Sequence, residues 1–252
     1  MIEVTGSVLG VDVGYSPKKA TTCFCVLRWS QSLIEFKFEL VGVDPSERCK
    51  KLKSILSQDE SLDAAAIDGP LTHGLTSITH YRATEALLSR GVLQKRGKPG
   101  QTSSPTGLKL HQHANELARI VLAENKLANA NHFQAIHEKR LVEAFPNLFL
   151  AAIINESNLP LLKRDASDRY WEYVTQQSSI LINLINFLLP GRQLLCPLQN
   201  YQHHDHRAGV ICALTALSVV SGHHISAGDP SDGDIVLPPL SVWGTNNNHN
   251  SY

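Results

Sequence analysis

SVLGVDV, at Ser7–Val13, is a short apolar run that ends in a Gly-Tyr-Ser-Pro turn. A second run, TTCFCVLRW at Thr21–Trp29, is rich in β-forming residues, so the two runs predict a β-hairpin. LIEFKFELVGV, at Leu33–Val43, alternates apolar and polar residues, which predicts a third strand with one solvated face. The chain therefore begins with three consecutive strands.

The hydrophobic period then changes from that of a strand to that of a helix over Ser46–Gln58. Ala64–Ile67 is a brief apolar run that ends in Asp68-Gly69-Pro70, as expected of a buried parallel strand that breaks into a loop. The later segments predict helices at Tyr81–Arg90, Leu110–Lys126, Asp165–Gln177, Ser179–Leu189 and Asp205–Ser221, and strands at Leu141–Phe145 and Asp234–Leu237. This order predicts an α/β fold with a mixed sheet and helices on both faces.

The domain organisation follows from the absence of any linker in a chain of 252 residues. We expect a single domain over residues 1–245 and a disordered tail over residues 246–252. The stretch GVLQKRGKPGQTSSPTG, residues 91–107, is basic and rich in Gly, Pro and Ser, which predicts a mobile loop.

Composition excludes several classes of protein. With 42% hydrophobic and 18% charged residues, the chain is neither disordered nor fibrous. Lys plus Arg and Asp plus Glu both total 23, so the formal net charge is zero and there is no global electrostatic case for binding nucleic acid. A local basic groove is still compatible with this balance.

Cysteine usage and hydropathy bear on the compartment. The five cysteines show no CxxC spacing, so we expect reduced thiols in a cytoplasmic protein. No signal peptide is evident at the N-terminus. The longest apolar stretch, Ile180–Leu189, contains two asparagines and is too short to span a bilayer, so no membrane partner is expected.

Four acidic residues occupy the ends or interiors of predicted elements. Asp12 lies near the end of the first strand, Asp68 ends the buried strand, Glu143 lies in an apolar run, and Asp205 opens the late helix. Carboxylates that converge in apolar surroundings repel one another unless a cation binds between them. Mg²⁺ or Mn²⁺ would resolve this repulsion, which points to hydrolysis of phosphodiester bonds.

Each acid also has a structural interpretation. Asp12 and Asp68 are of the type that forms turns by bonding its own backbone. Asp205 is equally suited to be the N-cap of its helix, and Glu143 to be a paired structural acid. The metal hypothesis rests on the common placement of the four rather than on any single motif.

The chain resembles the predicted ribonuclease H-like nucleases grouped as domain of unknown function 429. The resemblance covers nearly the whole chain and rests on the order of six segments: VLGVDVGYS, AAIDGPL, YRATEALLSRGV, VEAFPNLFL, LLKRDASDRYWEYV and HDHRAGVICALTAL. It implies a ribonuclease H-like sheet in which three antiparallel strands are continued by parallel ones. It also implies a nuclease that uses Mg²⁺ or Mn²⁺.

By this resemblance, Asp12, Asp68, Glu143 and Asp205 match the acidic residues of the family. Asp12 would bridge two metals about 4 Å apart, Asp68 and Asp205 would each complete one, and Glu143 would bind or position water. One departure is Ala208, which stands where a further aspartate is expected inside the late helix.

Six basic residues are candidate contacts to a DNA or RNA substrate. Those beside the acidic segments are expected to contact phosphate, and those on the predicted loop to follow the nucleic-acid backbone; they are Arg82, Lys163, Arg207, Lys95, Arg96 and Lys98. The alternative for each is a solvated surface charge.

Two other functions compete with the nuclease. Asp12–Gly14 also resembles the first phosphate loop of actin-like and sugar-kinase phosphotransferases, although no second Asp-x-Gly hairpin follows. A non-catalytic module that retains the fold is the other alternative, and Ala208 is the observation that favours it.

Overall fold

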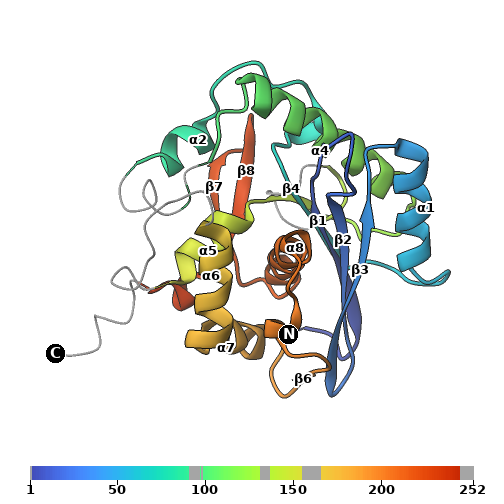
Figure 1. Cartoon of the computed structure of the whole chain (residues 1–252), viewed down its shortest axis with the longest axis vertical. Coiled ribbons are helices and arrows are strands. Elements are labelled where there is room, and N and C mark those ends of the chain that lie inside the picture. Colours follow the sequence, from blue (N-terminus) through green and yellow to red (C-terminus); the bar gives the residue numbers. More distant parts are fainter. Residues whose placement is uncertain (1, 91–96, 98, 131–136, 155–165, 245–252) are drawn as a thin grey trace.

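The computed structural model describes residues 2–90, 97, 99–130, 137–154 and 166–244. Within them, eight strands form one sheet in the order β6-β3-β2-β1-β4-β5-β8-β7 (Figure 1). The strands are β1 Gly6–Asp12, β2 Thr22–Trp29, β3 Leu33–Val41, β4 Ala64–Asp68, β5 Leu141–Ala144, β6 Gln193–Leu194, β7 Ile225–Asp229 and β8 Gly233–Leu237.

The strand directions confirm the predicted mixed sheet. β1, β2 and β3 pair antiparallel, and β4, β5 and β8 continue the sheet from β1 in parallel. This arrangement agrees with a ribonuclease H-like fold. Two edge strands were not predicted: β6 pairs parallel with β3, and β7 pairs antiparallel with β8.

Helices cover both faces of the sheet, as predicted (Figure 1). One face packs against α1 and α4, and the other against α5, α6, α7 and α8. The helices are α1 Pro45–Ile55, α2 Ala83–Leu88, α4 Pro105–Ala123, α5 Pro146–Ile153, α6 Ala166–Glu172, α7 Ile180–Leu188 and α8 His204–Val220.

The alternation of strand side chains builds the two cores. On β1, Val8 packs in the core under α8, whereas Leu9 and Val11 pack in the core under α1 and α4. Successive side chains of a strand point to opposite faces, so a central strand covered on both sides is apolar at every position. This is why Ser7–Val13 contains no surface residues until its end.

Helix α8 approaches the centre of the sheet very closely. A side chain at Gly10 of β1 would lie 2.2 Å from the backbone nitrogen of Ala213 and 2.4 Å from the carbonyl oxygen of Gly209. Only glycine permits this contact. The contact brings the first turn of α8 to the end of β1 at which Asp12 lies.

The predicted loop at residues 91–107 needs correction at its end. Helix α4 begins at Pro105, with the Ser104 side chain accepting a hydrogen bond from the Gly107 backbone at 3.1 Å, so the predicted loop 91–107 is wrong over its last three residues. Serine at the N-cap followed by proline is a normal helix start. Of the other residues of the predicted loop, the structure describes 97 and 99–104; residues 91–96 and 98, and the predicted tail at 246–252, lie outside the described residues.

No helix in the described ranges combines the length and apolar character that crossing a membrane requires.

Candidate metal centre

Asp12 and Asp68 lie side by side because their strands end together. Asp12 is the last residue of β1 and Asp68 the last of β4, and the preceding residues, Val11 and Ile67, are partners in the parallel register. The carboxyl ends of parallel strands form the usual crevice for ligands in such sheets. The two predicted carboxylates therefore share one edge of the sheet.

The electrostatic state of this pair is unusual. Burial raises the pKa of Asp12 well above its ordinary value, and the charges of Asp68 and Asp205 raise it further. Burial also raises the pKa of Asp68, to about 7, with a further contribution from Glu143. A side-chain hydrogen bond between the two carboxyl groups also raises the pKa of Asp12 and lowers that of Asp68.

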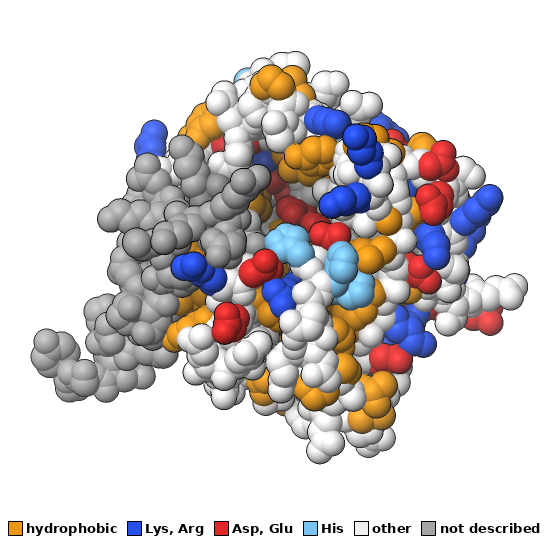
Figure 2. Space-filling model, viewed as in Figure 1, with side chains coloured by type: hydrophobic (Ala, Val, Ile, Leu, Met, Phe, Trp, Pro, Cys, Tyr) orange, Lys and Arg blue, Asp and Glu red, His pale blue; other side chains and the backbone are white. Residues whose placement is uncertain are grey.

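Asp205 joins the pair from helix α8. It lies in the first turn of the helix, after the N-cap residue His203, so the interpretation of Asp205 as the N-cap is wrong. Asp205 and Asp12 line the same open cavity of about 430 Å³. Figure 2 shows acidic side chains at the bottom of a hollow on this face, with histidine side chains at its rim.

Glu143 lies beside Asp68 but is held by other groups. Its two carboxylate oxygens accept hydrogen bonds from Arg82 Nη1 at 2.8 Å and Nη2 at 2.7 Å, and Oε2 also accepts from the Leu71 backbone at 2.8 Å. Glu143 and Arg82 are each only 2% exposed. The interpretation of Glu143 as a paired acid is therefore confirmed, and the Glu143 carboxylate is the charge that raises the pKa of Asp68 further.

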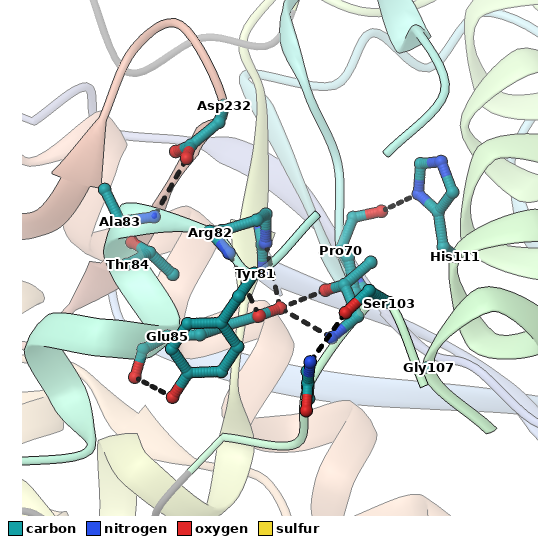
Figure 3. A network of polar contacts seen from close by, with 12 residues as sticks. Pro70, Tyr81, Arg82, Ala83, Thr84, Glu85, Ser103, Gly107, His111 and Asp232 are labelled. Atoms are coloured by element: carbon teal, nitrogen blue, oxygen red, sulfur yellow. Dashed lines mark hydrogen bonds and ion pairs between the residues drawn. The ribbon is translucent and has the colours of Figure 1, made fainter. Parts of the chain in front are cut away.

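Arg82 is not placed as a surface charge. Besides binding Glu143, its Nε donates to Glu85 Oε1 at 3.1 Å, and the backbone of Thr102 donates to the same oxygen at 2.9 Å. Figure 3 shows Arg82 and Glu85 close together at the start of α2. Arg82, predicted to contact phosphate, instead ties α2 to β5 and to the segment before α4.

Arg207 does reach the site. It lines a small cavity of about 70 Å³ together with Asp12, Asp68 and Ala208. Its Nη1 donates to Asp168 at 2.9 Å, which fixes the guanidinium. Lys95, Arg96, Lys98 and Lys163, the other predicted contacts, lie outside the described residues.

Sequence reasoning missed two residues that line the open cavity with Asp12 and Asp205. They are Tyr15, from the turn after β1, and Lys109, from α4. The Lys109 ammonium lies 5.3 Å from the centre of the Tyr15 ring. No local sequence signal marks Lys109, because its place at the cavity depends on how α4 packs. Tyr15, in contrast, lies only three residues after Asp12 in the sequence.

The carboxylates at the ends of β1 and β4 suit a metal ion that needs few protein ligands. Among the described residues, no three His, Cys, Asp or Glu side chains are placed to hold an ion together. Mg²⁺ commonly uses only one or two carboxylates and completes its shell with water and substrate phosphate. Asp12 and Asp68 fit that pattern, with Asp205 nearby, whereas a closed zinc site would need more ligands. A preformed cluster of three carboxylates, as the resemblance implied, is not present in the described ranges.

The raised pKa of Asp68 predicts how stability depends on pH. Its folded pKa of about 7 exceeds the ordinary 3.8, so the folded protein binds a proton that the unfolded chain has released between these values. Without metal, this contribution to the free energy of unfolding is lost as pH rises from about 4 to 7, by at most ~1.4 kcal/mol per pH unit.

Urea unfolding of wild type and Asp68→Asn across this range measures the effect. The wild type is expected to lose stability relative to the variant as pH rises, while the exposed Asp59→Asn control tracks the wild type. A constant difference between wild type and Asp68→Asn would show that Asp68 has an ordinary pKa.

Fold and site together define an α/β protein of ribonuclease H-like topology with an acidic centre where β1 and β4 end. The family model described as "Protein of unknown function (DUF429)" matches residues 10–232. The chain belongs to this family. No curated protein and no solved structure matches the chain.

Proposed function

We propose that this protein hydrolyses phosphodiester bonds of nucleic acid with Mg²⁺ or Mn²⁺. The observation that carries the proposal is the adjacent pair Asp12 and Asp68. Burial and neighbouring acidic side chains raise the pKa of both carboxyl groups. Two neighbouring carboxyl groups without a cation cost stability, and proteins retain such pairs chiefly where they act.

Asp12 and Asp68 would hold the metal, with Asp205 close enough to bind a second ion or a metal-bound water. When bound, the metal supplies an activated water and stabilises the charge on the leaving oxygen. Arg207 and Lys109 flank the carboxylates on two sides and would bind the phosphate that bears the cleaved bond. Asp168 orients Arg207 for this contact.

Nucleic acid is the favoured substrate class because two cavities meet at the carboxylates. Asp12 and Asp68 both line the small cavity, and Asp12 also lines the open one, so a substrate that occupied both cavities would pass Asp12. The five cysteines are free, which suits a reducing compartment such as the cytoplasm.

Hydrolysis of a defined panel tests the proposal. We expect the purified chain to cleave at least one of single-stranded, duplex, hybrid or branched DNA or RNA with Mg²⁺ or Mn²⁺, and to stop with chelator. Inactivity on the whole panel with both metals would contradict the proposal. It would favour the non-catalytic module, for which Ala208 in the wall of the small cavity is the specific argument.

A further inference from the structure

A separate apolar cavity adjoins the acidic pair. It has a volume of about 170 Å³ and lies between the ends of β4 and β5 and the first turns of α4. Most of its surface is apolar, with Leu110, Phe145 and Ile235 in the wall, and the charged residues Asp68, Arg82 and Glu143 also line it. The proposed hydrolysis does not use this cavity.

The size and lining indicate the kind of group that it would hold. An apolar cavity of about 150 Å³ accommodates benzene, whereas sites for drug-sized ligands begin at roughly 300 Å³. The cavity therefore suits one flat ring system. Gln101, which also lines the cavity, donates through Nε2 to Ser103 Oγ at 2.7 Å.

The position of the cavity indicates which kind of ring system it would bind. Asp68 and Phe145 line both this cavity and the small one that contains Asp12. A ring in the apolar cavity would therefore be next to a phosphate at the carboxylates. A nucleobase joined through its sugar to that phosphate has this connectivity.

We propose that the apolar cavity binds one unpaired nucleobase of the substrate, beside the phosphate at Asp12 and Asp68. The proposal rests on the proposed function and deepens it. A base enters such a pocket only when it is outside the helical stack, so the substrate class is nucleic acid with an unpaired nucleotide at the cleaved bond.

Binding of nucleoside 5′-monophosphates and of ribose 5-phosphate to the full chain with Mg²⁺, measured by calorimetry, tests the pocket without requiring cleavage. At least one nucleotide is expected to bind tenfold or more tightly than ribose 5-phosphate, since a buried ring contributes at least ~1.4 kcal/mol. Equal affinities, or no nucleotide binding up to about 10 mM, would overturn the proposal.

A matched pair of variants on α4 locates the binding. Thr106 is exposed at the cavity and Gln112 is exposed elsewhere on the helix, so Thr106→Trp and Gln112→Trp add the same ring to the same element. Thr106→Trp should lower nucleotide affinity about tenfold, and Gln112→Trp should leave it within about twofold. Leu110→Phe narrows the cavity from inside and is the second test. Equal effects of Thr106→Trp and Gln112→Trp on nucleotide affinity would overturn the proposal.

Failure of this inference differs from failure of the proposed function. Base-dependent nucleotide binding without any hydrolysis would retain the pocket and contradict the nuclease. Metal-dependent hydrolysis without base-dependent binding would retain the nuclease and contradict the pocket.

Discussion

Asp12→Asn is expected to lower metal-dependent hydrolysis on the order of a thousandfold or more. Asparagine keeps the shape of the side chain but removes the charge that would bind the ion. The metal contributes several kcal/mol of transition-state stabilisation, and each 1.36 kcal/mol is tenfold in rate. Single-turnover rates on the best substrate of the panel, with Mg²⁺ in excess, measure the loss.

Stability separates this loss from misfolding. The charges of Asp68 and Asp205 both disfavour ionisation of Asp12, so the neutral variant should unfold at the same or a higher urea concentration than wild type. Asp59→Asn removes one exposed carboxylate that lines none of the three cavities described above, and it should keep full activity. Undiminished hydrolysis by Asp12→Asn would place the chemistry elsewhere.

Arg82→Met is expected to destabilise the protein by about 3–5 kcal/mol. The variant leaves Glu143 and Glu85 buried without their cation, and an uncompensated buried charge costs about that much. Urea unfolding near neutral pH measures the change. The partly exposed pair of Lys51 and Glu39 provides the control, since Lys51→Met should cost no more than about 1 kcal/mol.

A second substitution checks the cause. Glu143→Gln in the Arg82→Met background removes one of the stranded charges, so the double variant should recover part of the lost stability. If Arg82→Met costs no more than Lys51→Met, the network at the start of α2 is not the anchor that its burial indicates.

Much of the fold could be predicted from local patterns. β1, β2, β3 and β4 follow from apolar runs and alternation, because each lies in the sheet interior or presents one clear face. β6 has two residues and β7 is largely exposed, so neither has a hydrophobic pattern to detect. The start of α4 carries a visible Ser-Pro capping signal that the surrounding Gly and Pro obscured.

The site residues likewise fall into those that local sequence predicts and those that it does not. Asp12 and Asp68 could be predicted because strand ends in a parallel pair fix where their side chains lie. The partnership of Glu143 with Arg82 joins residues 61 positions apart, and Lys109 reaches the cavity only through the packing of α4. Such contacts depend on tertiary structure, which no local spacing encodes.

The most direct measurement of the central claim is the position of Mn²⁺ in a crystal of this chain soaked with the ion, located by anomalous scattering. The account predicts Mn²⁺ coordinated by carboxylate oxygens of both Asp12 and Asp68, with the hydrogen bond between the two side chains broken. A soaked crystal in which these two side chains remain hydrogen-bonded to each other and bind no Mn²⁺ would contradict it.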